Sequence, residues 1–307
     1  GNVLQAVIIE NKNGRQAVRA RHFVDATGDA DLAFDAGVVS RDPGPLQPPT
    51  TCAKLQGMAG LKGFNWQAAL SEHGAEFNLE EDWGWGCGIP GLQDVQMRAD
   101  VHVFNTDVAD ATQLTRGEIE GRRKIRAILD ILRKYGPPGA PVGLVELAAT
   151  LGGRESRRIA ARHQLTGDEL LSGQRFTDAI ANGTYPVDIH TAGGAGICFR
   201  YLDGTEMSIP SRSAPAIRGR GREPLPADPT FYQIPLRSLV QDRVPNLVAA
   251  GRMIDTDKTA FSAVRVMVNM NQTGEAAGVA CVLAARGGGS VADVNPDDLR
   301  RTLAQGG

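Results

Sequence analysis

The sequence predicts a mixed α/β fold (α+β in character) built from short strands, tight loops and a few amphipathic helices. Two segments lead to this class. Late in the chain, an apolar strand at 247–250 runs into Gly251, and a helix rich in small residues is expected from about 262 to 286. Early in the chain, residues 23–28 (FVDATG) form a strand that stops on a glycine in the same way. The 37 glycines and 17 prolines fit many strand–loop transitions better than a helical bundle.

Composition places the chain among ordinary globular proteins. Its 307 residues are 42% hydrophobic, enough to bury a core and to form two subdomains. The net charge of -2 argues against a broad nucleic-acid-binding surface, and no apolar run is long enough to span a membrane. The cysteines have no paired spacing, so we expect no disulfide framework, no metal site and a reducing, cytoplasmic location. They are Cys52, Cys87, Cys198 and Cys281.

Two β-rich runs open the chain, residues 3–10 and 16–24. Asn13-Gly14 lies between them and predicts a hairpin, because both residues tolerate positive φ. A sequence that opens inside a hairpin is expected to have lost its beginning.

From 41 to 110 the pattern changes to clustered prolines and short mixed segments. We expect a substrate or cap domain at 41–230, inserted between two parts of another domain at 1–40 and 231–290. An exposed C-terminal tail is expected at 291–307.

A long helix is expected behind Thr115 and Glu118, whose spacing is that of a capping box. Gly136-Pro137 should end it. One face of this helix is apolar and should be buried. It carries Ile125, Ile128, Leu129 and Leu132.

Two further local signals follow. Thr166 and Glu169 form a second capping box and start a shorter helix. Asp203-Gly204 separates two apolar runs and predicts another hairpin, between strands at 197–202 and 205–209.

Residues 86–91 (GCGIPG) match the dinucleotide pattern G-x-G-x-x-G. That pattern binds phosphate only where a strand precedes it and a helix opens within it. Here two tryptophans precede the glycines and Pro90 lies inside. We therefore interpret the segment as a surface loop.

The segment from Gly251 to Arg265 is a stronger candidate for a cofactor site. A strand that ends on a glycine leaves backbone N–H groups free to meet a ribityl chain or pyrophosphate. Asp255 is a candidate ligand for a ribityl hydroxyl, and a helix start near Ser262 would direct its positive end at the N1–O2 edge of a flavin. The alternative is a plain βα unit whose small residues only pack.

The run 152–158 (GGRESRR) carries three arginines, Arg154, Arg157 and Arg158. They are candidates for an anion clamp on a carboxylate, because guanidinium groups offer paired donors. The alternative is a structural set of ion pairs with Glu155.

Asp188 and His190 are two residues apart, so on a strand their side chains point to the same side. Such a pair can serve as a general acid–base unit. The alternative is a histidine whose hydrogen bonds only support the fold.

Taken together, six blocks resemble the FAD-dependent oxidoreductase family related to the fumarate reductase and glutathione reductase-type flavoproteins. Their order and spacing cover nearly the whole chain. The blocks are residues 20–29, 114–123, 151–158, 185–190, 234–240 and 246–278.

This resemblance implies a flavin-dependent redox enzyme with a split, Rossmann-like FAD-binding domain and an inserted substrate domain. The cofactor-binding residues that it implies lie at two strand ends and in the segment that follows the second strand. They are Thr27, Gly28, Asp29, Gly251, Arg252, Asp255, Ser262, Ala263, Val264 and Arg265.

Two departures from the family pattern matter. Ala30 stands where the family has a second glycine after the Gly-Asp pair, so we expect an altered turn. The first βαβ unit, with its phosphate-binding glycines, is absent from the sequence, which makes the expected FAD-binding domain incomplete and the chain a C-terminal portion.

We therefore expect hydride transfer between FAD and a small organic substrate, with a carboxylate as one candidate. His190 is the candidate for proton transfer and Arg157 for holding the anion. Two alternatives stay open: a non-catalytic flavoprotein-like remnant or interaction module that does not bind FAD alone, and a flavoprotein that modifies tRNA. The absence of a basic excess argues against the second.

Overall fold

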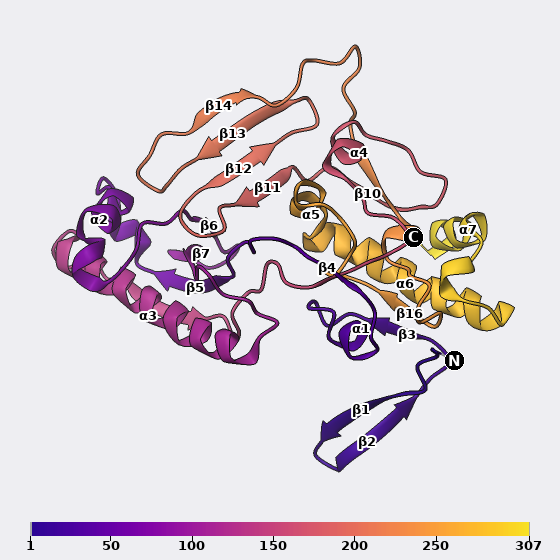
Figure 1. The fold of residues 1–307 in the computed structure, drawn as a ribbon. Helices are drawn as coiled ribbons and strands as arrows, with labels where there is room; N and C mark the ends of the chain where they lie inside the picture. Colours follow the sequence, from indigo (N-terminus) through magenta and orange to yellow (C-terminus); the bar gives the residue numbers. More distant parts are fainter. Residues whose placement is uncertain (1, 307) are drawn as a thin grey trace.

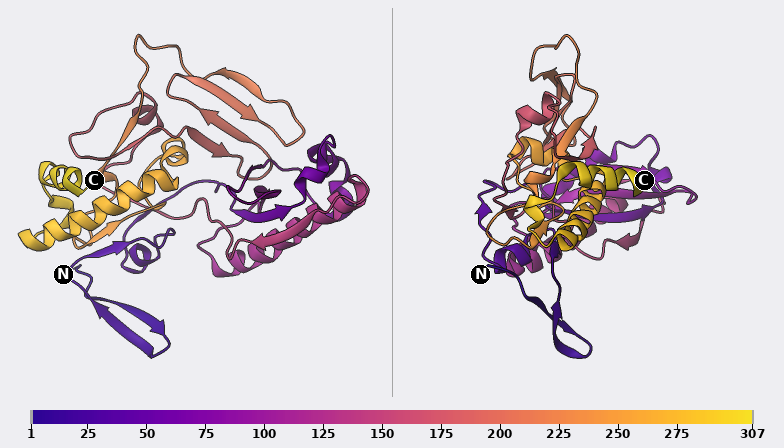
Figure 2. Two further views of the ribbon diagram at one scale, coloured as in Figure 1. Left: turned by 180° about the vertical axis from the view of Figure 1, so that it is seen from behind. Right: turned by 90° about the vertical axis from the view of Figure 1, so that its right-hand side faces the viewer.

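The computed structural model describes residues 2–306 and confirms the mixed α/β class. Figures 1 and 2 show three neighbouring regions. Helices α2 and α3 lie with the sheet β6-β7-β5-β8 at one end of the molecule. The long helix α6 lies with α7 and the strand pair β16-β3 at the other end, and the antiparallel sheet β11-β12-β13-β14 lies along one side of both.

The strands are β1 (Ala6–Asn11), β2 (Gly14–Arg19), β3 (Phe23–Asp25), β4 (Ser40–Arg41), β5 (Thr50–Gln56), β6 (Trp85–Gly88), β7 (Val95–His102), β8 (Gly143–Leu147), β9 (Arg158–Ile159), β10 (Ala179–Gly183), β11 (Val187–His190), β12 (Ile197–Arg200), β13 (Thr205–Ile209), β14 (Ile217–Arg220), β15 (Tyr232–Pro235) and β16 (Leu247–Ala249). The α-helices are α1 (Asp31–Asp35), α2 (Trp66–His73), α3 (Ala111–Tyr135), α4 (Gly167–Leu171), α5 (Lys258–Val264), α6 (Met267–Gly287) and α7 (Pro296–Gly306).

Strands β3 and β16 come from distant parts of the sequence and pair in parallel, with Val24 opposite Val248 and Asp25 opposite Ala249. Asn246 fixes their start, because its side-chain amide donates hydrogen bonds to the carbonyls of Leu4 and Arg21. Parallel strands end at the same edge of a sheet, so the loops that follow β3 and β16 emerge side by side.

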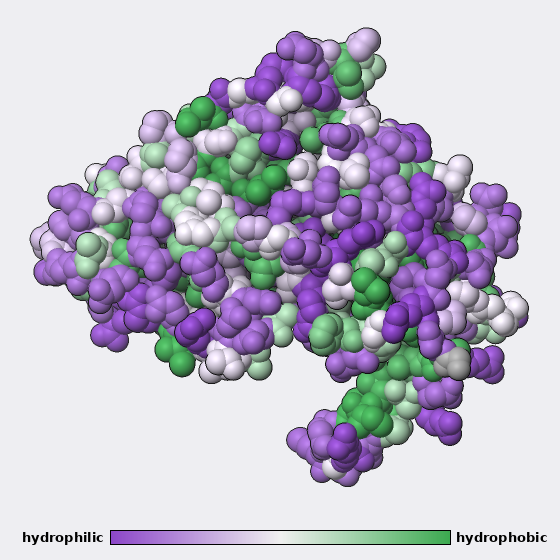
Figure 3. All heavy atoms as spheres, in the orientation of Figure 1, coloured by the Kyte–Doolittle hydropathy of each residue, from purple (hydrophilic) through white to green (hydrophobic). Residues whose placement is uncertain are grey.

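The predicted hairpin at Asn13-Gly14 is confirmed: β1 and β2 pair antiparallel, and Gly14 has a φ of 91°. The hairpin projects from the body of the molecule (Figure 1). Its sides carry exposed apolar residues, Ile8 and Val18 among them. Figure 3 shows a green, hydrophobic surface along this projection.

Helix α3 confirms the expected buried face and the expected end before Gly136, but its start was predicted wrongly. The helix begins at Ala111, and its N-cap is Asp110, whose carboxylate accepts a hydrogen bond from the Gln113 N–H. Thr115 therefore lies inside the first turns, where its hydroxyl donates to the Ala111 carbonyl. An aspartate is as good a cap as a threonine, so the capping-box pattern placed the start of the helix five residues too late.

The second capping box is confirmed. The Thr166 hydroxyl accepts from the Glu169 N–H, and the Glu169 carboxylate accepts from the Thr166 N–H. The hairpin at Asp203-Gly204 is also confirmed, between β12 and β13.

Residues 86–91 are only partly the predicted loop. Strand β6 covers the first glycines and pairs with β7, and a turn follows at 89–92. No helix opens in this segment, so it lacks an element that the G-x-G-x-x-G pattern needs to bind phosphate.

The helix predicted from 262 to 286 is two helices, α5 and α6, separated by an extended Val266. Helix α5 begins at Lys258, capped by Asp257, so Ser262 lies inside the helix and not at its positive end. The glycine-bearing face of α6 is open: a Cβ built at Gly274 or Gly278 would meet no atom within 4 Å.

Most residues of the predicted exposed tail are exposed, but part of it is a helix. Residues 296–306 form α7, which packs on α6 through the fully buried Leu299. The largest apolar core collects side chains from 165–181, from β15 and β16, and from α5 and α6. The division at 41 and 230 stays a prediction.

Two helix-interior glycines give opposite expectations for substitution by alanine. A Cβ at Gly121 in α3 would overlap the Thr51 hydroxyl on β5, whereas a Cβ at Gly278 would meet nothing. We expect Gly121→Ala to lower the free energy of unfolding by about 1–3 kcal/mol and Gly278→Ala to raise it by about 0.5–1 kcal/mol. Urea unfolding of both variants measures the difference. Equal effects would show that α3 does not pack against β5 as described.

Candidate functional site

The loop after β3 is folded around one buried carboxylate. Asp25 Oδ1 accepts hydrogen bonds from the Thr27 N–H (3.0 Å) and hydroxyl (2.8 Å), and Oδ2 accepts from the Ala33 N–H (2.8 Å). Gly28 then takes a φ of 87°, which leaves Thr27 exposed at the strand end. Ala30, where a glycine was expected, adopts the left-handed conformation itself (φ 58°), so the turn is kept at a cost of about 1–2 kcal/mol in strain.

The loop after β16 contacts the loop after β3 at this strand end. Gly251 has a φ of 119°, and Arg252 reaches across so that its Nη2 lies 3.1 Å from Asp29 Oδ1. The Ser156 hydroxyl donates to the same oxygen at 2.5 Å. A Cβ at Gly28 would lie 2.8 Å from Arg252 Nη2, so only a glycine leaves room for the guanidinium. The structure thus brings five of the expected cofactor residues together.

The other expected cofactor residues are internal. Asp255 is fully buried, and its carboxylate binds the Arg41 Nε (3.1 Å) and the Ala161 N–H (2.7 Å). Ser262 is also fully buried and donates to the Lys258 carbonyl. In this structure both side chains have structural partners, and neither has surface left for a ribityl hydroxyl. Ala263 and Val264 are fully buried as well.

The three arginines of 152–158 separate. Arg157 donates to Asp31 Oδ1 at 2.7 Å and lies over the Phe34 ring, on the side of α1. Arg158 pairs with the fully buried Glu155.

Glu155 supports the segment from the other side as well. Its two carboxylate oxygens accept from Lys258 Nζ (2.8 Å each), and one accepts from the Gln47 N–H (2.9 Å). The predicted ion-pair alternative therefore describes Arg158, while Arg154 points elsewhere.

Asp188 and His190 share one side of β11 as predicted, with His190 Nε2 3.5 Å from Asp188 Oδ1. The carboxylate is committed to other partners, however, since it forms an ion pair with Arg265 and accepts from the Tyr185 hydroxyl at 2.7 Å. Arg265 is thereby drawn away from the strand-end loops to β11.

Burial holds the pKa of His190 far below its usual range, and the nearby Arg154, His102 and Arg265 lower it further. His190 is consequently a neutral imidazole in the folded protein.

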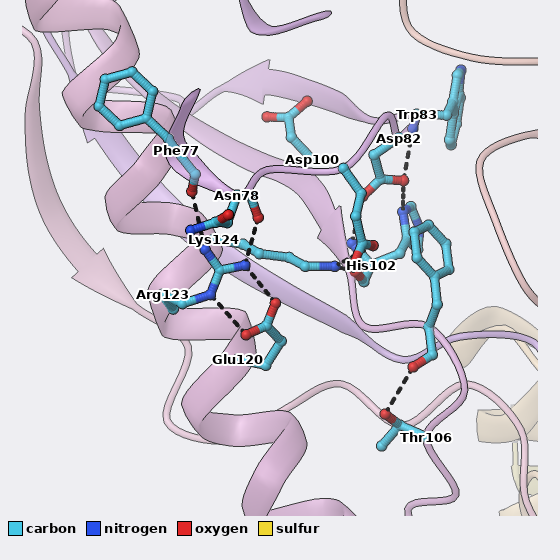
Figure 4. A network of polar contacts seen from close by, with 12 residues as sticks. Phe77, Asn78, Asp82, Trp83, Asp100, His102, Thr106, Glu120, Arg123 and Lys124 are labelled. Carbon is cyan, nitrogen blue, oxygen red and sulfur yellow. Dashed lines mark hydrogen bonds and ion pairs between the residues drawn. The ribbon is translucent and has the colours of Figure 1, made fainter. Parts of the chain in front are cut away.

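A second histidine, which sequence reasoning missed, has the better carboxylate partner. His102 Nδ1 lies 2.8 Å from Asp82 Oδ1, and the His102 N–H donates to Asp82 Oδ2 at 2.8 Å (Figure 4). Lys124 on α3 donates to the His102 carbonyl at 3.0 Å. The rings of His102 and His190 are 4.8 Å apart, so both imidazoles belong to one buried cluster. Asp82 and His102 are too far apart in sequence for any spacing rule to join them.

Comparison with known proteins adds one family. A family model described as FAD dependent oxidoreductase matches residues 1–303. No curated protein matches the chain. Within residues 2–306, no helix combines the length and apolar character needed to cross a membrane.

The neutral His190 predicts acid sensitivity. The unfolded chain binds a proton at His190 below a pH of about 6.5, and the folded protein does not. The unfolded state therefore gains protons as the pH falls, and the free energy of unfolding should drop by up to about 1.4 kcal/mol per pH unit.

His190→Gln removes this contribution. The measurement is urea unfolding of both proteins between pH of about 7.5 and 5.5. A difference between them that stays constant over this interval would mean that His190 binds a proton equally well in the folded and the unfolded state.

Proposed function

The chain belongs to the FAD dependent oxidoreductase family, and from that premise we propose that it transfers a hydride between a small organic anion and FAD. The observation that carries the proposal is the meeting of two loops, one early and one late in the sequence, at the shared edge of β3 and β16. FAD, when bound, supplies the site that gives or takes the hydride.

The residues at this edge fit such a cofactor. Thr27 is exposed at the end of β3, where it can meet a ligand, while Gly28 is buried beneath the Arg252 guanidinium. Gly251 adds a second backbone segment without a side chain, and Arg252 adds a partly exposed cation. We propose that these groups and Asp29 contact FAD, with Arg252 facing its anionic part.

His190 is proposed to accept the proton that the substrate loses together with the hydride. A neutral imidazole is the form that can accept one. The buried cations around His190 oppose its protonation, so the transfer would be short-lived and the proton would pass on. His102, the adjacent imidazole, has Nδ1 engaged by Asp82 and Nε2 facing the Arg154 guanidinium, so it is not the group that takes this proton.

Arg157 was the candidate for holding the substrate anion. Arg157 is paired with Asp31 on the side of α1. We therefore assign this role to the arginines near His190, which are Arg154 and Arg265.

Gly28→Ala tests the cofactor assignment. The new methyl group would displace Arg252 and strain a residue with positive φ. The strain lowers the stability of the folded chain by about 1–2 kcal/mol. Because the displaced Arg252 would no longer face the anionic part of FAD, we expect FAD affinity to fall by about tenfold. The measurement is an FAD titration followed by flavin absorbance and fluorescence.

Gly14→Ala is the matched control, because Gly14 has nearly the same φ (91° against 87°) but lies at the hairpin tip with no neighbour within 4 Å. It should bind FAD like the wild type. A protein purified from its full gene that is colourless and takes up no FAD would overturn the proposed function in favour of a non-flavin scaffold.

A further inference from the structure

Arg154 differs from several other buried or half-buried arginines of this protein. Among those with a carboxylate partner are Arg98 with Asp100, Arg158 with Glu155, Arg252 with Asp29 and Arg265 with Asp188. In the range 2–306, no carboxylate oxygen lies within 4.0 Å of the Arg154 guanidinium.

The partners of Arg154 are all uncharged. Its guanidinium donates to the Pro48 carbonyl, to the Thr50 hydroxyl at 2.7 Å and to His102 Nε2 at 3.5 Å, and its buried Nε has no partner among the described residues. Burial lowers the pKa of Arg154 to about 9, and the nearby Arg265 lowers it further, while Asp188 and Asp82 raise it from a distance without contacting the guanidinium. A cation taken out of water without a counter-ion costs free energy that the fold alone does not recover.

His102 is arranged to hold this cation in place. A guanidinium only donates, so His102 Nε2 must face it as an acceptor, which puts the ring proton on Nδ1. Asp82 accepts from that Nδ1, and it also fixes the backbone of His102 (Figure 4). Asp82 at Nδ1 and Arg154 at Nε2 therefore select the same tautomer of His102.

The surroundings suit an organic anion rather than a bare ion. Trp83 lies edge-on to the His190 ring at 5.8 Å, and Phe104 stacks beside His102 at 6.4 Å between ring centroids. Gly152 is exposed and Arg154 is only partly buried as a residue, so this segment reaches the surface of the molecule.

We propose that Arg154 receives a carboxylate group of the substrate, and that the Asp82–His102 pair positions its guanidinium. This assignment rests on the proposed function for the reaction that follows. The carboxylate supplies the counter-ion that Arg154 lacks, and it places the rest of the substrate beside the two imidazoles and the aromatic side chains.

The test uses propionate as the probe and propionamide as its neutral counterpart. The chain has five histidines, whose ring nitrogens are resolved by long-range proton–nitrogen NMR, with His102→Gln and His190→Gln for assignment. We expect propionate to shift the His102 and His190 signals to saturation in the millimolar range and propionamide to leave them unchanged. The same spectra should show His102 with its proton on Nδ1.

Two arginine variants separate the candidates. Arg154→Gln should abolish the propionate-induced shifts, and Arg157→Gln should keep them. If Arg154→Gln does not fold, Arg154→Lys keeps the charge but loses the paired donors, and its affinity should fall by about tenfold. Shifts that survive in Arg154→Gln or Arg154→Lys with wild-type affinity would overturn the proposal.

Asp82→Asn tests the positioning role. We expect it to change the His102 tautomer and to weaken propionate binding by about tenfold, with His190 as the reporter. Unchanged affinity together with a changed tautomer would overturn the positioning role. An FAD titration on the same samples separates the two proposals. Propionate binding at Arg154 without FAD uptake would support the carboxylate subsite and contradict the proposed function. FAD uptake without any effect of propionate would support the proposed function and contradict the subsite.

Discussion

The parallel pairing of β3 with β16 is the constraint on which the arrangement of the candidate site depends. The pair is short, and it joins strands more than 200 residues apart, so closing that loop costs conformational entropy that three residue pairs cannot offset alone. The surrounding apolar core, with Phe23, Leu247 and Met253 buried, supplies the rest. Because the strands run in the same direction, both glycine turns are delivered to one edge, and Asp29 can meet Arg252.

Local signals in the sequence predicted the structure correctly where residues close together in the chain determine the backbone conformation. The hairpins at Gly14 and Gly204 and the cap at Thr166 follow from residues within a few positions of one another. The errors at α3 and α5 have a common cause. In each case an aspartate, Asp110 or Asp257, caps the helix ahead of the residue that was chosen. Several residues can cap, and packing of the apolar face decides which one does.

The site itself was predictable only in its strand-end half. Gly28 and Gly251 are recognisable because a glycine after an apolar strand has a local meaning. The contact between Asp82 and His102 has no local signal in the sequence. The two residues meet only because β7 packs beside the segment that precedes β6. For Asp188 the local inference is correct, because it lies on the same side of β11 as His190. However, its carboxylate forms an ion pair with Arg265, which is 77 residues away at the end of a helix.

One segment connects the two halves of the candidate site. In residues 154–158, Arg154 faces His102, Ser156 donates to Asp29, and Arg158 pairs with Glu155. Residues 154–157 have no regular secondary structure and β9 begins only at Arg158, so the side chains of this short segment diverge and reach both the strand-end loops and the histidine cluster. The fully buried Glu155 forms an ion pair with Lys258 and so fixes the position of this segment against α5. Arg154 and Asp29 therefore hold a fixed separation, and a substrate anchored at the one would be presented at a defined place relative to a cofactor bound at the other.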